Sequence, residues 1–354
     1  MSERQHKDNS FAGDFGNYAD MLVEEISQQT TESQSANADQ FGLFNVKPAH
    51  QWLEQANNRP IPKMLFGEMW HEGELCILFA DTNLGKSILT VQIGDSISQG
   101  RAIPGSKLEA PKQPILYFDF ELSDKQFEAR YSVNYQQHYR FDRNFLRAEI
   151  NPDCTLPESQ TFEDYLNASL EQSIIQTGAR VLIIDNLTYL RNETERAKDA
   201  LPLMKHLKAL KSRYGLSILA LAHTPKRDLT KPLTRNDLQG SKMLINFCDS
   251  AFALGESSQD KQIRYLKQVK ARNTEIIYDS ENVCLYQIAK PHNFLQFEWI
   301  GYGSERQHLR QQSEQDKAGI VDRVKEMVTE GKSQRVIASE IGISLGAVNK
   351  YAKQ

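Results

Sequence analysis

The sequence predicts an α/β protein with a mainly parallel sheet covered by helices on both faces, followed by a small all-α domain. Short runs that are apolar throughout alternate with helical stretches, which is the pattern of buried parallel strands and their crossover helices. One such run, 75–80, leads through a polar loop into Gly85-Lys86-Ser87 and then into a helix. This is the context of a phosphate-binding loop, or P-loop. Near the C-terminus, three apolar stripes at helical spacing predict the all-α domain.

Length and composition indicate a globular protein of about two domains. Its 40% of hydrophobic and 25% of charged residues are ordinary for a soluble chain. The sequence has neither a long apolar run nor a secretory leader, so we expect a cytoplasmic protein without a membrane span. The four widely spaced cysteines form no Cys-x-x-Cys pair, which favours reduced thiols over disulfides or zinc. A net charge of −4 argues against a uniformly basic nucleic-acid surface but is compatible with a local basic channel.

The chain divides into four predicted parts. Residues 1–40 hold eight acidic and two basic residues and are expected to form a disordered acidic tail. Residues 41–305 form the sheet domain, which begins with a lead-in that packs either on the domain's own core or on a neighbouring subunit. Residues 306–316 are expected to form a linker, and residues 317–354 the all-α domain.

The remaining elements of the sheet domain follow from apolar runs and helix boundaries. The P-loop helix stops near Gly100, and Ser123 begins the next helix. A helix over 159–177 is closed by Gly178, and a further helical stretch stops at Gly215. The predicted strands after the P-loop strand are 115–121, 181–185 and 217–223.

The P-loop carries the chemistry of ATP binding, because its backbone N–H groups and the following helix N-terminus face the phosphates. The predicted ATP-binding residues are Asp81, Thr82, Asn83, Leu84, Gly85, Lys86, Ser87 and Ile88. Lys86 would reach the β- and γ-phosphates, and the Ser87 hydroxyl would bind Mg²⁺. Ala80 stands where the motif has glycine. Its Cβ would weaken nucleotide binding if the backbone there took a positive φ.

Polar residues end the other predicted strands, at the edge where open α/β sheets bind ligands. Asp185 fits a Walker B aspartate, which orders Mg²⁺ together with Ser87. Asn186 follows, although many P-loop ATPases place their water-activating glutamate there, so the base must come from elsewhere. Glu121 is predicted as this base, with Asp119 as its competitor. Strand alternation would put both carboxylates on one face, so the preference for Glu121 depends on its position.

Four segments carry a resemblance to a known group. They are Phe118-Asp119-Phe120-Glu121-Leu122-Ser123, Leu221-Ala222-His223-Thr224, Leu238-Gln239-Gly240-Ser241-Lys242 and Val269-Lys270-Ala271-Arg272-Asn273. Together with the P-loop they resemble RecA-fold ATPases of the hexameric helicase group, including the plasmid RepA-like and DnaB-like helicases. The resemblance covers roughly residues 64–290.

This resemblance implies a RecA-like fold and a role for each matched residue. Glu121 would be the catalytic base, and His223 would be a polar sensor. Lys270 and Arg272 would act in trans on the γ-phosphate of the adjacent subunit, so the protein would be a homo-oligomer, with a hexameric ring as the expected form. A solvated basic strand edge is the alternative for these two residues. Ala80 and the lack of a recognisable primase-binding or helical-hairpin domain depart from the family, and they weaken the case for replicative helicase activity more than that for ATP hydrolysis.

The resemblance also implies a mobile DNA-facing loop closed by the Gly-Ser pair. Basic residues between His223 and the end of that loop are candidates for gripping the phosphates of single-stranded DNA in a central channel. They are Lys226, Arg227, Lys231, Arg235 and Lys242. A flexible surface loop with solvated charges is the alternative.

In the C-terminal domain, the run 331–344 resembles the helix-turn-helix of resolvase- and transposase-type DNA-binding domains. The last helix of that fold enters the major groove of duplex DNA. The candidates for DNA contact are Ser344, Asn349, Lys350 and Lys353. A three-helix protein-docking module is the alternative.

The function expected from these patterns is that of an ATP-hydrolysing DNA-handling motor with ATP and Mg²⁺ as cofactors. The family resemblance places it in replication or mobilisation of a plasmid or another mobile element. Two alternatives stay open. One is an ATP-dependent regulator or loader that binds DNA without unwinding it, and the other is a DNA-binding transcriptional regulator whose P-loop is inactive.

Overall fold

The computed structural model describes residues 44–190, 200–225, 227–238, 241–311 and 314–353. The predicted acidic tail, residues 1–40, lies outside these described residues. The chain divides into two compact units, residues 1–61 and residues 62–354. In the described part of the first unit, helix α2 (Ala49–Asn57) has no buried residue, and its Trp52 side chain is exposed.

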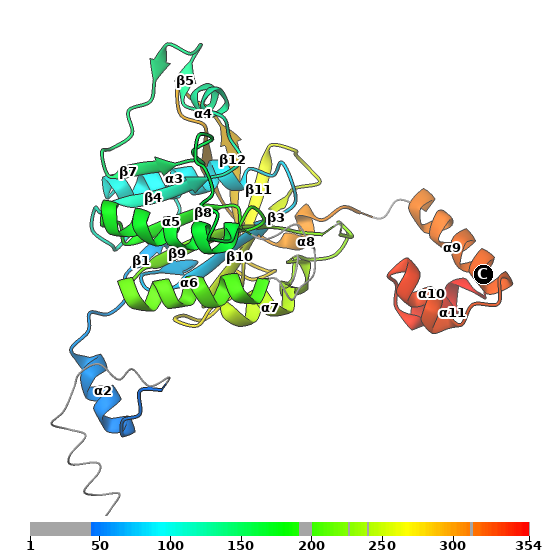
Figure 1. Cartoon of the computed structure of the whole chain (residues 1–354). Coiled ribbons are helices and arrows are strands. Elements are labelled where there is room, and N and C mark those ends of the chain that lie inside the picture. Colours follow the sequence, from blue (N-terminus) through cyan, green and yellow to red (C-terminus); the bar gives the residue numbers. More distant parts are fainter. Residues whose placement is uncertain (1–43, 191–199, 226, 239–240, 312–313, 354) are drawn as a thin grey trace, which may run out of the picture. The chain divides into compact units, whose positions relative to one another are not determined.

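A large sheet forms the centre of the second unit (Figure 1). Its parallel strands are β3 (Leu75–Ala80), β4 (Ile115–Asp119), β7 (Phe145–Ala148), β8 (Val181–Asp185), β9 (Ser217–His223) and β10 (Ser250–Glu256). Three antiparallel strands extend it: β11 (Ile263–Lys270), β12 (Val283–Ala289) and β13 (Gln296–Gly303). The spatial order is β13-β12-β11-β10-β3-β9-β8-β4-β7. The P-loop strand β3 therefore lies between β9 and β10, and β9 separates it from β8.

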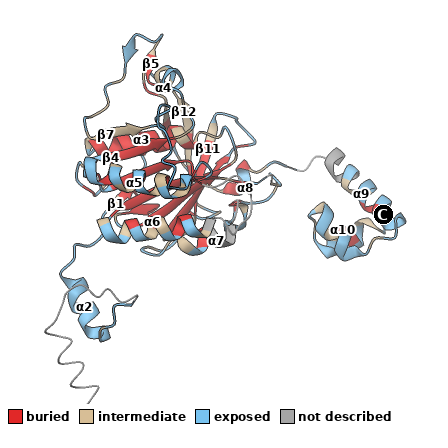
Figure 2. Cartoon of the chain, viewed as in Figure 1, coloured by how far each residue is buried: buried red, intermediate tan, exposed pale blue. Residues whose placement is uncertain are grey.

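The central parallel strands are buried on both faces, which explains their uninterrupted apolar sequences. Every residue of β3, β4 and β8 is buried (Figure 2). Side chains of α3 (Lys86–Gln99) pack on one face of the sheet. Those of α5 (Phe162–Thr177), α6 (Ala200–Tyr214) and α7 (Ser241–Phe247) pack on the other. This arrangement confirms the predicted α/β class, a mainly parallel sheet with helices on both faces.

The C-terminal ends of α3 and α5 and the start of α4 lie where the sequence predicts them, whereas α5 starts at Phe162 and not at residue 159. Gly100 and Gly178 follow α3 and α5 with φ of 72° and 65°, a left-handed conformation that glycine adopts without strain. Ser123 caps α4 (Asp124–Arg130) in a reciprocal capping box with Gln126. The strand predicted over 115–121 is shorter than expected, because β4 ends at Asp119.

Several elements were not predicted from the sequence. They are the parallel strands β7 and β10, the antiparallel strands β12 and β13 and two small hairpins, β1 (Met64–Phe66) with β2 (Trp70–His71), and β5 (Ser132–Val133) with β6 (Gln137–His138). Most residues of β13 are only partly buried, so this strand lacks the continuous apolar run that marks the central strands.

The C-terminal part is all-α, as predicted. Its described helices are α9 (Glu314–Thr329), α10 (Gln334–Ile341) and α11 (Leu345–Tyr351). Ser333 and Ser344 cap α10 and α11 by accepting hydrogen bonds from backbone N–H groups. The helices share a small core of Val324, Met327, Ile337 and Val348.

The segment expected as a linker, residues 306–316, begins within a short helix α8 (Glu305–His308). Glu305 and His308 are buried and bonded to the sheet domain, so ordered structure of that domain reaches at least His308. Among the described residues, no helix combines the length and the apolar character needed to cross a membrane.

Candidate nucleotide site at the carboxyl edge of the sheet

The P-loop connects the end of β3 to the start of α3. Ala80 is the last residue of β3, is fully buried and does not have a positive φ. The conformational strain that the Cβ of Ala80 would cause at a positive φ is therefore absent. Positive φ values occur instead at Asn83 (62°) and Gly85 (99°). A Cβ on Gly85 would lie 3.1 Å from side-chain atoms of Ile288 and Phe297, so both the backbone conformation and the close packing favour glycine there.

Lys86 lies across the inside of the P-loop. Its Nζ donates to the backbone oxygens of Ala80 (3.1 Å) and Asp81 (3.0 Å). The side chain is buried, and this desolvation lowers the pKa of Lys86. The ammonium group is thus held at the mouth of the loop, where a bound phosphate would meet it.

Asp185 ends β8 and is buried. Its Oδ2 accepts a hydrogen bond from the Tyr117 hydroxyl at 2.7 Å. Burial raises the pKa of Asp185 to about 6, although hydrogen bonds from Ser87 and Tyr117 oppose this shift. The structure therefore brings Ser87 and Asp185 together from the P-loop helix and from β8.

The Ser87–Asp185 pair fits a Mg²⁺ site of the kind found with nucleotides. Mg²⁺ prefers oxygen ligands, and it is usually held by one or two carboxylates together with substrate phosphates. Among the described residues, no group of three or more His, Cys, Asp or Glu side chains is placed to hold a metal without such help. A hydroxyl and a carboxylate beside a phosphate loop therefore match Mg²⁺ bound with a nucleotide.

Glu121 lies just beyond β4 and faces the same edge. Asn186 Nδ2 donates to Glu121 Oε1, and His223 Nε2 lies 3.7 Å from that oxygen. The neighbouring His223 is the main cause that lowers the pKa of Glu121, and the charge of Lys86 and the amide of Asn186 add to it. Glu121 is therefore an ionised carboxylate, which is the form a general base needs.

Asp119, the competing candidate for the base, has a different environment. Its Oδ2 accepts from Arg147 Nε at 2.9 Å. Its Oδ1 accepts from the backbone N–H groups of Glu121 (3.2 Å) and Leu122 (3.0 Å). Because β4 ends at Asp119, the expected alternation does not extend to Glu121, and the two carboxylates point to different partners. Asp119 stabilises the turn that carries Glu121.

His223, at the end of β9, connects the P-loop lysine to Glu121. Its Nδ1 lies 3.2 Å from Lys86 Nζ, and its Nε2 lies 3.2 Å from Asn186 Nδ2. An ammonium group only donates hydrogen bonds, so Nδ1 accepts from Lys86. Nε2 and the Asn186 amide both lie next to the same oxygen of Glu121. In the sequence, Asn186 was noted only because many P-loop ATPases have their catalytic glutamate at that position, and its contact with Glu121 was not predicted.

Lys270 and Arg272 lie at the amino-terminal end of the parallel strands, opposite the carboxyl end that carries the P-loop. Lys270 pairs with Ala251 at the start of β10. Arg272 forms a 3.0 Å ion pair with Asp249, whose carboxylate also accepts from Leu75 N at the start of β3. Both cations also donate to backbone oxygens at the C-terminal end of α7. Within one subunit they are therefore separated from the P-loop by the length of the parallel strands.

The loop after β9, which carries the predicted DNA-contacting residues, is anchored at Leu233. The Leu233 N–H donates to Glu305 Oε1 at 2.6 Å, and its backbone oxygen accepts from Lys267 Nζ at 2.7 Å. Lys267 and Glu305 form a buried ion pair at 2.6 Å. The middle of the loop is thus fixed to β11 and α8.

The basic residues of this loop lie in different surroundings. Arg227 is half-buried and donates to the backbone oxygen of Lys231 at 2.6 Å. Lys231 is exposed, as is Arg235, which begins the short helix η1 (Arg235–Asp237). Lys226 lies outside the described residues. Lys242 belongs to α7, but its side chain is not among those described.

The predicted DNA contacts in the C-terminal domain lie on or next to α11. The Ser344 hydroxyl accepts from Ala347 N at 3.1 Å as the helix cap. Asn349, Lys350 and Lys353 are exposed.

The chain is similar to a known protein family and to a solved structure. The sequence profile of an AAA domain family matches residues 44–228. A solved structure of a KaiC-like protein from the hyperthermophilic archaeon Pyrococcus horikoshii OT3 is similar over 64% of this chain and 90% of that one, with 13% identity and a TM-score of 0.44. No curated protein matches the chain.

Proposed function

The chain belongs to the AAA domain family, and from this premise we propose that it is a P-loop ATPase of the RecA type that acts as a DNA-handling motor driven by ATP hydrolysis. The observation that carries the proposal is the meeting of Lys86, Glu121 and His223 at one edge of the sheet. These residues come from three different strand ends, and contacts between their side chains connect the phosphate loop to a carboxylate base.

The proposed hydrolysis assigns a task to each residue. Ser87 and Asp185 would hold Mg²⁺, which supplies charge neutralisation on the phosphates when it is bound. Lys86 contacts the terminal phosphates and leaves its backbone partners to do so. Glu121 orients the attacking water and accepts its proton. His223 then transmits the movement of Lys86 to Glu121, because it touches both side chains.

Lys270 and Arg272 support a shared active site in a homo-oligomer. In their own subunit they lie at the edge opposite the P-loop, so they can serve a nucleotide only across an interface between subunits. A cation supplied in this way stabilises the charge of the transition state. A ring, with six subunits as the expected number, gives every subunit such a neighbour.

DNA is the proposed partner, in two places. The basic loop after β9 would contact single-stranded DNA, and the exposed polar face of α11 would contact duplex DNA. A role in replication or mobilisation of a plasmid or another mobile element follows from the family resemblance of the matched segments.

The test is steady-state ATP hydrolysis with and without single-stranded DNA, with Glu121→Gln as the matched variant. We expect hydrolysis that single strands stimulate and that the variant abolishes, while it still binds ATP. Activity in Glu121→Gln close to that of the unaltered protein would remove Glu121 from the mechanism. If ATP is not hydrolysed under any condition, the motor proposal is wrong, and DNA binding with an inactive P-loop takes its place.

An ATP-dependent regulator or loader is a second candidate, which one observation favours. The loop after β9 is anchored through the Lys267–Glu305 pair. An anchored loop is as compatible with a nucleotide-dependent conformational switch as with a loop that moves along DNA. Unwinding of a forked duplex separates the two. Strand separation that depends on ATP supports the motor, whereas hydrolysis that responds to duplex DNA without strand separation supports the regulator.

A further inference from the structure

Strand β4 carries a tyrosine among its apolar residues, and the tyrosine hydroxyl lies at the carboxyl end of the neighbouring strand β8. Tyr117 is fully buried, and its hydroxyl donates to Asp185 Oδ2 at 2.7 Å. In the register of the two strands, Tyr117 lies opposite Ile183, which precedes Asp185 by two residues and shares its face of the sheet. The tyrosine side chain therefore reaches along β8 to its end. A phenylalanine would fill the same apolar space without burying a polar group, so the hydroxyl needs an explanation of its own.

The ring of Tyr117 is held in place by the packing around it. It packs against Phe145 of β7, with ring centroids 6.1 Å apart. Helix α3 approaches this part of the sheet closely, because a Cβ on its Gly94 would lie 2.8 Å from the Phe145 ring and 3.2 Å from the Ile183 side chain. Side chains packed this closely have little freedom to change rotamer. The Tyr117 hydroxyl is therefore a hydrogen-bond donor at a fixed position.

This donor orients the carboxylate of Asp185. The backbone of β8 fixes the Cα of Asp185, but the terminal torsion of an aspartate side chain has a broad energy minimum. A hydrogen bond from a fixed donor to Oδ2 restricts that torsion. Mg²⁺ requires near-ideal octahedral geometry, so the direction of a carboxylate that helps to hold it affects how well the ion is bound.

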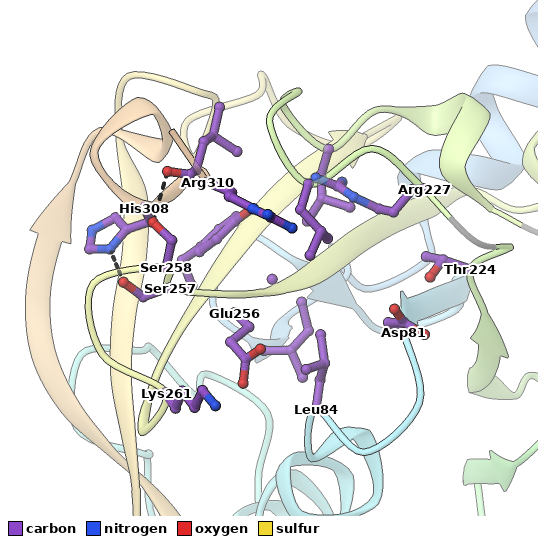
Figure 3. A pocket seen from close by; sticks show the side chains of 16 residues that line it. Asp81, Leu84, Thr224, Arg227, Glu256, Ser257, Ser258, Lys261, His308 and Arg310 are labelled. Carbon is purple, nitrogen blue, oxygen red and sulfur yellow. Dashed lines mark hydrogen bonds between the residues drawn. The ribbon is translucent and has the colours of Figure 1, made fainter. Parts of the chain in front are cut away.

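We propose that Tyr117 is a positioning residue for the Mg²⁺ site assigned to Ser87 and Asp185. The inference rests on the proposed ATPase function and adds to it a residue that touches neither nucleotide nor metal. A pocket of about 360 Å³ borders the P-loop (Figure 3), and Tyr117 does not line it. Because Tyr117 is also fully buried, its hydroxyl acts only through Asp185. Groups that orient a metal ligand in this way typically contribute about 10- to 100-fold to metal affinity or activity.

The experiment measures how strongly Mg²⁺ tightens nucleotide binding. Calorimetry gives the dissociation constant of AMP-PNP, an ATP analogue that resists hydrolysis, with Mg²⁺ and with EDTA, and the ratio of the two constants is compared between variants. Because both constants come from the same variant, a reduced folded fraction cancels in the ratio. Tyr117→Phe removes the hydroxyl and keeps the ring. Tyr117→Met also removes the hydroxyl and provides a second variant with an adaptable side chain if Tyr117→Phe does not fold.

Tyr131→Phe is the matched control. Tyr131 is 3% exposed, and its buried hydroxyl has no hydrogen-bond partner among the described residues. This variant therefore loses a buried tyrosine hydroxyl that orients no other group.

We expect Mg²⁺ to tighten AMP-PNP binding by the unaltered protein and by Tyr131→Phe to the same extent. In both Tyr117 variants this effect of Mg²⁺ should be about ten-fold smaller, while the affinity measured in EDTA stays unchanged. An undiminished effect of Mg²⁺ in a folded Tyr117 variant would overturn the positioning role and leave the hydroxyl a structural role alone. A loss of affinity that is equal with Mg²⁺ and with EDTA would overturn it as well.

Two further outcomes separate this inference from the function on which it rests. If the unaltered protein binds AMP-PNP equally with Mg²⁺ and with EDTA, the Mg²⁺ site of Ser87 and Asp185 is wrong, and the role of Tyr117 is overturned with it. If the unaltered protein binds no AMP-PNP under either condition, the proposed ATPase function itself is wrong.

Discussion

Asn186 shows how one residue can hold the predicted base in place. Its amide and the Nε2 of His223 converge on Glu121 Oε1, and the pKa of Glu121 is lowered, chiefly by the neighbouring His223. A lower pKa keeps the carboxylate ionised but makes it a weaker proton acceptor. The groups that contact Glu121 therefore orient its carboxylate and do not make it a stronger base.

Replacing Asn186 with alanine should reduce kcat for ATP about ten- to a hundred-fold, because a misplaced catalytic group costs rate steeply. It should also shift the pH profile. The lost donor stabilises the ionised form of Glu121, so the pKa of the base rises and the acid limb of kcat/KM moves to higher pH. An acid limb at the original pH would contradict this role. Asn282→Ala removes an exposed amide that donates to Ile277 O and should leave the profile unchanged.

The sequence predicted Glu121 and did not predict the role of Asn186, for a physical reason. A carboxylate just after an apolar strand marks the ligand edge of a sheet, so Glu121 and Asp185 could both be found from their positions. The contact between Asn186 and Glu121 exists only because β4 and β8 are neighbours, with Asp119 opposite Asp185. Strand order of this kind leaves no signal at the asparagine itself.

Among the secondary-structure elements, the parallel strands β3, β4, β8 and β9 were predicted, whereas the parallel strands β7 and β10 and the antiparallel strands β12 and β13 were not. β8 and β9 lie where their apolar runs predicted them, because burial on both faces excludes polar residues. β13 has one partly exposed face and a mixed sequence, so no run marks it. The attachment of the β9 loop to this edge also had no sequence signal, since Lys267 and Glu305 are far apart in the chain and resemble ordinary surface charges.

The Lys267–Glu305 pair gives a prediction at this scale. Its side chains are 10% and 0% exposed and also bond to Leu233 and to Ser280. Lys267→Met leaves a buried carboxylate without its cation, so the free energy of unfolding should fall by about 3–5 kcal/mol, as measured by urea denaturation. The double variant Lys267→Met/Glu305→Leu should recover part of this loss, because both charges are removed together.

Lys125→Met provides the matched control for that prediction. Lys125 is 78% exposed and pairs with Glu128 on the surface of α4, where an ion pair contributes at most about 1 kcal/mol. A Lys267→Met variant as stable as this control would show that the buried pair does not anchor the loop.

For the whole molecule, the positions of Lys270 and Arg272 decide how the active site is assembled. The P-loop lies at the carboxyl end of the parallel strands and the two cations lie at their amino end, so in the proposed shared active site each subunit would supply only one part. The bonds of these cations to Asp249 and to the end of α7 also have a plain structural explanation. A structural role acts within one subunit, whereas a catalytic role acts across an interface, and subunit mixing distinguishes the two.

Arg272→Ala and Glu121→Gln should each be inactive alone and regain ATP hydrolysis when mixed. The Arg272→Ala subunit supplies an intact P-loop with Glu121, and the Glu121→Gln subunit supplies an intact Arg272. In a one-to-one mixture about a quarter of the interfaces then combine both intact edges, because each subunit meets its neighbour head to tail. Arg213→Ala removes a surface partner of Glu171 and should hydrolyse ATP normally without mixing. If the mixture stays inactive although both variants fold and associate, Arg272 acts within its own subunit. The active site is then not shared between subunits, and hydrolysis does not require a ring.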